Sequence, residues 1–479
     1  MNILHNTPRL VIAGLAGDSG KSAVSMAILH QCRKAGLSIR AFKKGPDYID
    51  AAWLSRISGE PARNLDSWLM GADGSAASFH RHSVRDGLNL VEGNRGLFDG
   101  ADSSGTHSTA ELAKSIRAPV LLVVNVTKMT RTAAALVLGC QHLDPDLRLA
   151  GVVINRVHGA RHESVLRAAI ESATGLPVLG AIPALANGIL PNRHLGLVTP
   201  SDHQGFKELT DTLETIAAEL DIRRIMELAT GSAPLDIAAP NEPPLPCRNR
   251  PNTRIAIVRD AAFNFYYPEN IEALAAGGAE LVFVSALEAA ELPPNLDAIY
   301  IGGGFPEVHA AGLAANRAFL NALAGAANGG LPIYAECGGL MLLARSIEWK
   351  GTRHPMSAVL PMDVTVDAHP QGHGYVDLSV TEPNPFFPQG TTLRGHEFHY
   401  SNIIPQPAMP RTACAVRRGT GAYDKRDGVI QGNVWASYTH LHATATPEWA
   451  DAILRVARKH QENCRKSEQP ISGCKTVSP

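Results

Sequence analysis

Two long series of short apolar runs, each alternating with helical patterns, most constrain how this chain folds. The first series extends from residue 9 to about residue 230, and its clearest strand candidates are Leu10–Ala13, Val120–Val124 and Gly151–Ile154. The second series begins with Ile255–Val258, Leu281–Val284 and Ala298–Ile301. Such alternation is typical of parallel βαβ units. We therefore expect an α/β protein with two parallel-sheet domains.

A stretch without periodicity separates the two series. Residues 233–252 read "APLDIAAPNEPPLPCRNRPN", and their Pro and Asn content indicates a linker. This predicts one domain over residues 1–232 and a second over residues 253–460. Within the second domain, residues 351–440 are rich in Gly, His and β-formers, which favours mixed strands and loops. Residues 461–479 are polar, and we expect a disordered tail there.

Composition excludes several classes of protein. The formal net charge of −1 gives no overall field for nucleic acid or a membrane surface. No apolar run reaches the roughly 18 residues of a transmembrane helix, and the start "MNILHNTPRLVIAGL" lacks the features of a signal peptide. The seven cysteines are scattered, without CxxC or zinc-ligand spacing. These features predict a cytoplasmic protein with free thiols.

A glycine-rich loop follows the first predicted strand. The stretch "GLAGDSGKS" places Gly14, Gly17 and Gly20 where backbone amides approach an anion, with Lys21 as a point charge and Ser22 as a Mg²⁺ ligand. The usual G-x-x-x-x-G-K-[ST] pattern is shifted, because Leu15 occupies the first glycine position and Gly14 comes one residue earlier. A chance Lys-Ser pair after a glycine turn is the alternative. The flanking strand and helix favour a site for ATP phosphates.

Two further stretches offer carboxylates for Mg²⁺. "FKKGPDYIDAAWL" contains Asp47 and Asp50, and "LVEGNRGLFDG" contains Glu92 and Asp99. Glu92 ends an apolar run, and the carboxyl ends of parallel strands border the crevice where ligands bind. An Asp in a Gly/Pro turn is often only a turn former, so that alternative stays open for each.

Cys337 lies between a predicted strand and a predicted helix in "PIYAECGGLMLL". The strand is expected to end at Ala335 and the helix to begin near Gly338, with small residues at 335 and 339 as a crowded nucleophile turn requires. The helix N-terminus should lower the thiol pKa. A buried, inert cysteine is the alternative.

Partners for a cysteine nucleophile occur elsewhere in the second series. "VWASYTHLHA" supplies His440 and His442 as candidate bases. "YIGGGFPE" supplies Gly303 and Gly304, whose amides would form an oxyanion hole. Together with the predicted turn, these residues favour the nucleophile over the inert cysteine.

With these motifs in place, the chain resembles the cobyrinic acid a,c-diamide synthase family, glutamine-dependent amidotransferases of cobalamin synthesis. The resemblance covers about residues 8 to 445. It rests on motifs in the expected order: "GDSGKS", "FKKGPDYID", "RNLDSW", "VEGNRGLFDG", "GVVINRV", "LPNRHLGLV", "GGGFPE", "AECGGLM", "GHEFHYS" and "SYTHLH". The resemblance implies a P-loop domain similar to dethiobiotin synthetase, followed by a class I glutamine amidotransferase domain.

The resemblance also implies roles for individual residues. Lys21 and Ser22 would hold ATP and Mg²⁺, Asp47 and Glu92 would complete the metal site, and Asn155 would contact adenine. Tyr48 and Asp99 would lie near the substrate carboxylate. Cys337 would be the glutaminase nucleophile and His440 its base. His442 stands where many related glutaminases have glutamate, so the third member of a triad has no candidate.

The implied reaction is ATP- and glutamine-dependent amidation of the a and c carboxylates of cobyrinic acid through acyl phosphates. Asn94, Arg95 and Phe98 depart from the family pattern near the proposed acceptor, which leaves the tetrapyrrole open. The alternatives are hydrogenobyrinic acid, a sirohydrochlorin, the reaction of cobyric acid synthase, and a P-loop ATPase switch without amide formation. The expected partners are a tetrapyrrole, L-glutamine and ATP, without nucleic acid or membrane, and a homodimer stays open.

Overall fold

The structure is a computed structural model that describes residues 7–184, 192–193, 196–234 and 253–468. The chain divides into two compact units, Met1–Asn241 and Glu242–Pro479, and each is described by itself. Most of the predicted linker, residues 235–252, lies outside the described residues, as does part of the "LPNRHLGLV" stretch. No helix in the described part of the chain has the length and apolar character needed to cross a membrane.

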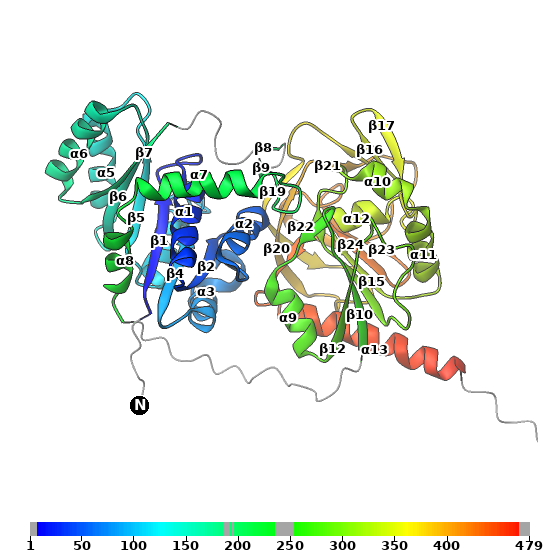
Figure 1. Cartoon of the computed structure of the whole chain (residues 1–479). Coiled ribbons are helices and arrows are strands. Elements are labelled where there is room, and N and C mark those ends of the chain that lie inside the picture. The colour runs from blue at the N-terminus through cyan, green and yellow to red at the C-terminus, as the bar shows by residue number, and fades with distance from the viewer. Residues whose placement is uncertain (1–6, 185–191, 194–195, 235–252, 469–479) are drawn as a thin grey trace, which may run out of the picture. The chain divides into compact units, whose positions relative to one another are not determined.

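Unit 1 is built on a seven-stranded sheet whose strands are all parallel, in the order β3-β2-β4-β1-β5-β6-β7 (Figure 1). The strands are β1 Arg9–Gly14, β2 Ser38–Lys44, β3 Arg63–Leu65, β4 Gly87–Glu92, β5 Val120–Asn125, β6 Leu149–Val157 and β7 Val178–Pro183, with β8 Asn192–Arg193 and β9 Gly196–Leu197 as a separate short pair. The helices are α1 Lys21–Lys34, α2 Tyr48–Ser58, α3 Ser67–His82, α4 Thr109–Ser115, α5 Arg131–Leu143, α6 Ala160–Thr174, α7 Phe206–Ala218 and α8 Ile222–Thr230.

Helices cover both faces of this sheet, which explains why its strands read as continuous apolar runs. Every residue of β1 is buried. Val11 and Ala13 belong to a core shared with α3, α4, α5 and α6, while α1, α2, α7 and α8 pack against the sheet or one another on the other side. The three strands predicted in this series are confirmed. The strand order reverses direction at β1, which lies between β4 and β5, so the loops after β1 and β4 border the same crevice.

Unit 2 contains a ten-stranded mixed sheet in the order β12-β10-β13-β15-β24-β23-β22-β19-β20-β25. Its strands are β10 Thr253–Val258, β12 Ala279–Val284, β13 Ala298–Ile301, β15 Ile333–Glu336, β19 Gly372–Val380, β20 Thr392–His399, β22 Thr412–Arg418, β23 Arg426–Gln431, β24 Val434–Ser437 and β25 His440–Leu441. The first five strands are parallel, and the rest pair antiparallel. The three early strands predicted here are confirmed, as are the mixed strands of residues 351–440.

Smaller elements complete unit 2. They are β11 Phe263–Phe265 and β14 Gly303–Gly304, which pair with each other, a sheet of β16 Ser346–Trp349, β17 Thr352–Pro355, β18 Asp363–Val366 and β21 Ser401–Ile403, and the helices α9 Pro268–Ala276, α10 Ala310–Ala315, α11 Arg317–Asn328, α12 Gly338–Leu343 and α13 Glu448–Glu468.

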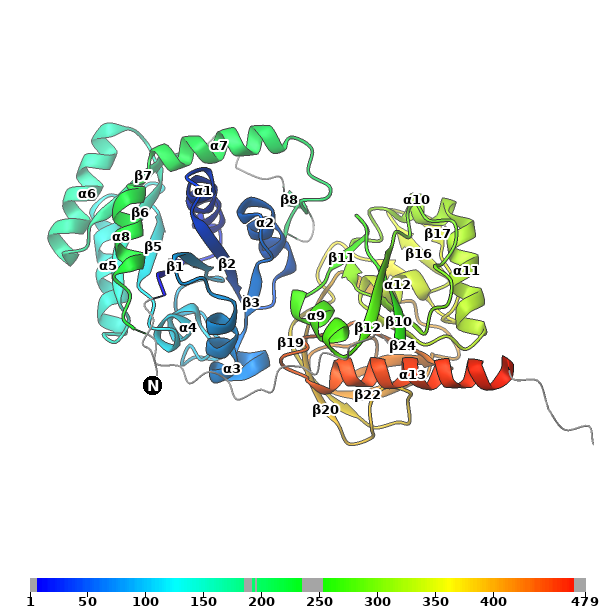
Figure 2. The same cartoon turned by 60° about the horizontal axis from the view of Figure 1, so that its bottom comes forward.

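The C-terminal helix α13 corrects one expectation. Residues 461–468, predicted to be disordered, continue α13, whereas residues 469–479 lie outside the described residues. Trp449, Ile453 and Leu454 bury its apolar face in the core, and the helix contacts β10 and β13. Figure 2 shows α13 lying beside β10. Once packing has nucleated a helix, each further residue adds a hydrogen bond at little cost, so a polar segment is able to extend it.

Candidate active sites

The loop between β1 and α1 surrounds the amino group of a buried lysine. Lys21 is the first residue of α1, and its Nζ donates to the carbonyl oxygens of Ala16 at 2.9 Å and Arg95 at 2.8 Å. Burial, followed by the nearby Lys43 ammonium, lowers the pKa of Lys21. The two carbonyls come from the loops after β1 and β4, so the ammonium of Lys21 lies between these loops, and its contact with phosphate stays a prediction.

Gly20 and Asn155 hold the end of this loop. Gly20 has a φ of +101°, and a Cβ there would lie 2.2 Å from the Asn155 Nδ2, so only glycine fits without a shift. Asn155 donates from Nδ2 to the Ser19 carbonyl at 2.9 Å and accepts from the Arg156 amide at 2.9 Å. Asn155 therefore ties β6 to the loop, and its contact with adenine stays a prediction.

The other two glycines differ in their surroundings. A Cβ on Gly14 would lie 2.7 Å from the Ser19 Cβ, whereas a Cβ on Gly17 would meet nothing within 4 Å. Beside the loop lies a cavity of about 480 Å³, lined in part by Gly17, Ser19 and Phe98. Gly17 thus borders open space rather than packed protein, which leaves room for a ligand.

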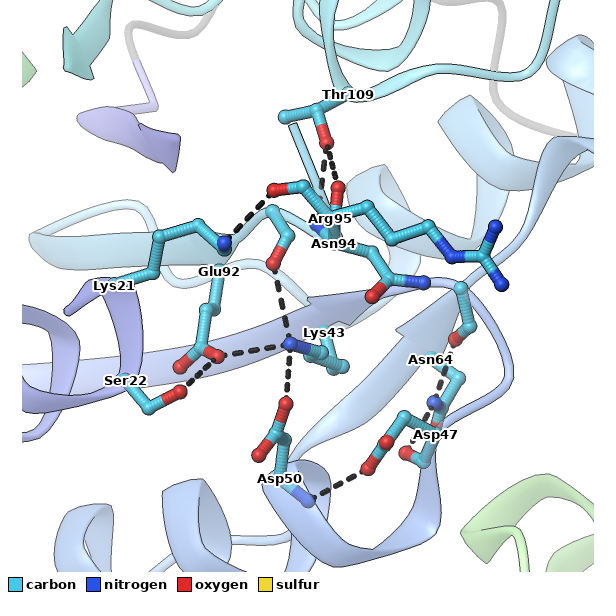
Figure 3. A network of polar contacts seen from close by, with 12 residues as sticks. Lys21, Ser22, Lys43, Asp47, Asp50, Asn64, Glu92, Asn94, Arg95 and Thr109 are labelled. Carbon is cyan, nitrogen blue, oxygen red and sulfur yellow. Dashed lines mark hydrogen bonds and ion pairs between the residues drawn. The ribbon is translucent and has the colours of Figure 1, made fainter. Parts of the chain in front are cut away.

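Two of the predicted metal residues lie together beneath the loop. Ser22 Oγ donates to Glu92 Oε1 at 2.8 Å, and Lys43 Nζ donates to the same oxygen at 2.8 Å (Figure 3). The other Glu92 oxygen, Oε2, is buried and has no hydrogen-bond partner among the described residues. Burial raises the pKa of Glu92, although Lys43 opposes the shift. A buried carboxylate oxygen without a donor, next to a hydroxyl, fits Mg²⁺.

Asp47, the third predicted metal residue, has a different contact. It is the N-cap of α2, and its Oδ1 accepts from the Asp50 amide at 2.7 Å (Figure 3). Burial, and then the carboxylate of Asp50, raises the pKa of Asp47 to about 7. In the part of the chain that is described, no three His, Cys, Asp or Glu side chains form a ready metal site. A bound Mg²⁺ would therefore take many ligands from phosphate and water.

Lys43 received no role from the sequence, and Asp50 was offered only as one candidate carboxylate for Mg²⁺, yet both are central to the network. Lys43 lies 2.6 Å from Asp50 Oδ2 and 2.8 Å from Glu92 Oε1, and its side chain is 2% exposed. Burial opposes its charge, but Asp50 and Glu92 outweigh burial and raise the pKa of Lys43. The signal that would have found Lys43 is register, because parallel β2 and β4 place it directly beside Glu92.

The two predicted substrate residues follow neighbouring strands at the same sheet edge, Tyr48 as the first residue of α2 and Asp99 in the loop after β4. Tyr48 is buried at the start of α2. Asp99 is exposed and accepts from the Gly96 amide at 2.8 Å, as a turn former does. Asn94 lies against the turn at Gly45, where an added Cβ would come within 2.9 Å of its Nδ2. The contacts of Tyr48 and Asp99 with a substrate stay predictions.

In unit 2, Cys337 occupies a strained turn between β15 and α12. Its φ of +47° and ψ of −97° are rare for a residue with a side chain, and its amide donates to the Ser437 carbonyl at 2.7 Å. A Cβ on Gly339 would lie 2.6 Å from the Ile301 carbonyl oxygen, so the space is as crowded as expected. The strand ends at Glu336, one residue later than predicted. This is the geometry of a nucleophile elbow.

The first amide of α12 acts on the thiol in the expected direction, but other groups outweigh it, so the expected low pKa of Cys337 is not found. Burial, followed by the charge of Glu307, raises the pKa of Cys337 well above its ordinary value, and the hydrogen bond from Gly338 lowers it only in part. The helix α12 has six residues, so its dipole is short. A thiolate would need a proton acceptor nearby.

His440 lies against the predicted oxyanion loop. A Cβ on Gly303 would come within 2.5 Å of the His440 Cε1 and 3.3 Å of its Nε2, and a Cβ on Gly338 would lie 3.0 Å from the Gly304 amide nitrogen. The glycine pair therefore borders both the imidazole of His440 and the turn after Cys337. The roles of Gly303 and Gly304 as donors to an oxyanion stay predictions.

Each histidine of the "THLH" stretch faces a different carboxylate. The Nδ1 of His440 lies 3.4 Å from Glu336 Oε2, and the Nε2 of His442 lies 3.6 Å from Glu269 Oε2. Sequence reasoning missed both carboxylates, and Glu336 stands directly before Cys337.

A phosphate-type loop with an acidic partner in one unit, and a cysteine elbow beside a histidine in the other, define a glutamine amidotransferase with a nucleotide-binding domain. Family models agree on both halves. Residues 10–197 match the CobQ/CobB/MinD/ParA nucleotide binding domain, and residues 254–448 match the CobB/CobQ-like glutamine amidotransferase domain.

Over nearly its whole length, the chain belongs to the cobyrinate a,c-diamide synthase family. It is 40% identical over 461 residues to the cobyrinate a,c-diamide synthase of Magnetococcus marinus, covering 95% of this chain and 98% of that protein. The enzyme of the same name from Dehalococcoides mccartyi strain CBDB1 is 40% identical over 465 residues, which cover 95% of this chain and 99% of that protein. The cobyrinate a,c-diamide synthase of Methanosarcina acetivorans is 37% identical over 479 residues, which cover 94% of this chain and 96% of that protein.

Proposed function

We propose that this enzyme amidates the a and c carboxylates of cobyrinic acid, with ATP as the energy source and glutamine as the nitrogen donor. The single observation that carries the proposal is that one chain holds both the Lys21–Ser22–Glu92 constellation and the strained Cys337 turn beside His440. The names of the relatives, matched over about 95% of the chain, supply the substrate.

The ligase half of the reaction activates a carboxylate. A carboxylate oxygen of the macrocycle attacks the γ-phosphorus of ATP, and ADP leaves, which produces an acyl phosphate. Lys21 would neutralise negative charge on the phosphates while the γ-phosphoryl group transfers from ADP to the carboxylate oxygen. Ser22 and Glu92 would hold Mg²⁺, which would supply stabilisation of the phosphate charge when bound. Asp47, Tyr48 and Asp99, on loops at the same edge, would then face metal or acceptor.

The glutaminase half supplies ammonia. Cys337 attacks the side-chain amide carbon of glutamine, His440 takes the thiol proton and gives it to the departing ammonia, and water hydrolyses the resulting thioester to glutamate. The lone pair of ammonia attacks the acyl phosphate, and phosphate leaves with one of the protons of ammonia. The product is a carboxamide.

Mass spectrometry of a tetrapyrrole panel tests the proposal. Cobyrinic acid, hydrogenobyrinic acid and a sirohydrochlorin are each incubated with ATP, Mg²⁺ and glutamine, and the number of carboxylates converted to amides is counted from the mass. We expect two conversions on cobyrinic acid. Conversion at four positions would indicate the reaction of cobyric acid synthase, conversion of another macrocycle would reassign the substrate, and ATP turnover without amide would indicate a switch protein.

A further inference from the structure

The catalytic histidine of a glutaminase needs a group that orients its ring, and the position two residues after His440 does not supply one. His442 packs its ring on Tyr267, with centroids 4.5 Å apart, and its Nδ1 accepts from the Thr444 amide at 3.1 Å. Its Nε2 faces Glu269 rather than His440. The contacts of His442 therefore point away from the nucleophile.

Glu336, unlike His442, contacts the imidazole ring of His440. Its Oε2 lies 3.4 Å from the Nδ1 of His440, and both side chains are almost fully buried, at 0% and 2% exposure. The hydroxyl of Tyr300 donates to Oε2 at 3.3 Å, and the amide of Leu441 donates to Oε1 at 3.3 Å. The carboxylate is thus held from two sides, by β13 and by β25, while the Cε1–Nε2 edge of the imidazole faces Gly303.

We propose that Glu336, the residue directly before the nucleophile, is the positioning residue for His440. A neutral His440 that donates its Nδ1 hydrogen to Glu336 leaves Nε2 as the acceptor for the Cys337 proton. The carboxylate then stabilises the imidazolium while the thiolate attacks glutamine, and Glu336 itself takes no proton. This role deepens the proposed function and rests on it.

The charge of Glu336 acts on Cys337 by two routes of opposite sign, which makes the proposal testable. Directly, burial and then Glu307 contribute most to the raised pKa of Cys337, and the Glu336 carboxylate adds to the same shift. Through His440, it favours the imidazolium and therefore the thiolate. Other titratable groups also act on these residues: His396 on β20 stacks on His440 with ring centroids 5.0 Å apart, and Tyr300 donates to Glu336. Tyr266 and Tyr334 also lie near Glu336, and Glu307, Asp427 and Tyr438 lie near Cys337. None of them changes in the variants below.

The first experiment compares Glu336→Gln with a matched control, Glu269→Gln, which removes the carboxylate that faces His442. Glutamate release from glutamine and amidation driven by ammonium salt are both measured. We expect Glu336→Gln to lower kcat for glutamine by about 10²-fold or more with ammonia-driven amidation unchanged, and Glu269→Gln to remain close to wild type. A normal glutaminase rate in Glu336→Gln, or an equal loss in both variants, would overturn the proposal.

The second experiment measures how fast a glutamine-like chloromethyl ketone alkylates Cys337 as pH is varied, with the labelled peptide quantified by mass spectrometry. A positioning role predicts that Glu336→Gln moves the midpoint of this profile to higher pH. In a His440→Ala background, where only the direct route remains, the same substitution should move the midpoint to lower pH. Movement to lower pH in both backgrounds would mean that Glu336 acts only as a nearby charge.

A third measurement needs no variant of Glu336. Nitrogen-15 NMR of the wild-type histidines, with His440 assigned by comparison with His440→Ala, reports which ring nitrogen carries the hydrogen. The proposal requires hydrogen on Nδ1, and hydrogen on Nε2 in the resting enzyme would overturn it. The proposed function fails separately, because a wild-type enzyme that releases no glutamate from glutamine would exclude it whatever the state of Glu336.

Discussion

Lys43 shows, at the scale of one residue, how a buried charge organises the nucleotide site. Its ammonium lies between Asp50 and Glu92 in a place that Mg²⁺ would also favour. A lysine in this position compensates the charges of buried Glu92 and half-buried Asp50 when no metal is bound. Removing one member of a buried ion pair costs more than the pair contributes, because the other charge stays buried.

Replacing Lys43 by methionine should therefore destabilise unit 1 by about 3–5 kcal/mol. Thermal unfolding without nucleotide is the measurement. The double variant Lys43→Met/Glu92→Gln is the control, since it also removes one of the stranded charges, and it should recover part of the loss. If the single variant unfolds like wild type, Lys43 does not compensate the carboxylates.

The raised pKa of Asp47, about 7, predicts a pH dependence of stability. Between about pH 4, where the unfolded carboxyl titrates, and about pH 7, the folded protein holds a proton that the unfolded chain has lost, so this residue lowers stability as pH rises. Asp47→Asn, which still caps α2, should come closest to wild type at about pH 4 and exceed it by about 1–2 kcal/mol at about pH 8, a value reduced because the Asp47 side chain is only half-buried.

Thermal unfolding of both proteins across that pH range, without Mg²⁺, provides the comparison. Asp73→Asn on the exposed side of α3 serves as the control for loss of a negative charge. A difference between wild type and Asp47→Asn that stays constant with pH would contradict the prediction.

At the scale of elements, the candidate site residues gather at junctions, where strands end and helices begin. The loop after β1 ends in Gly20, whose backbone only glycine adopts easily, and it passes Gly17, whose missing side chain faces open space. The two glycines therefore serve different purposes. Gly20 allows the backbone conformation that the loop requires, and Gly17 leaves room for a ligand.

Alanine at each of these positions separates the two purposes. Gly20→Ala should lower the melting temperature, because its positive φ and the contact with Asn155 both oppose a Cβ. Gly17→Ala should melt like wild type yet raise the KM for ATP. Melting curves and initial rates at varied ATP give both quantities. Equal loss of stability in the two variants would show that the open space at Gly17 has no special relation to a ligand.

At the scale of the whole molecule, the two candidate sites belong to different units, each with its own core. In the proposed reaction, the ligase needs only ammonia from the glutaminase, so damage to one site should leave the other chemistry measurable. This separation predicts different phenotypes for damage at the two sites.

Cys337→Ala should lose glutamine-driven amidation by several orders of magnitude and retain amidation driven by ammonium salt at mildly alkaline pH. Lys21→Ala should lose amidation with either nitrogen source, because phosphate transfer loses its main cation. The deciding quantity is the ratio of glutamine-driven to ammonia-driven rate. If Cys337 were only a core residue, alanine would affect both sources alike and leave that ratio unchanged.

The sequence by itself determined the parts whose signals are local. The six strands chosen from apolar runs, the glycine loop with Lys21 and the turn at Cys337 are confirmed, because each depends on neighbours a few residues away. The boundary of the C-terminal tail was wrong for residues 461–468, since the helix extends from packing that begins earlier in the chain.

Only the tertiary structure decided which distant side chains meet. Lys43 and Glu92 are 49 residues apart, and Glu336 and His440 are 104 apart. The first pair depends on the register of β2 against β4. The second depends on β25 joining the far end of the mixed sheet beside β20 while Glu336 ends a central strand. Strand order and register arise from burial of the whole core, and no local pattern encodes them.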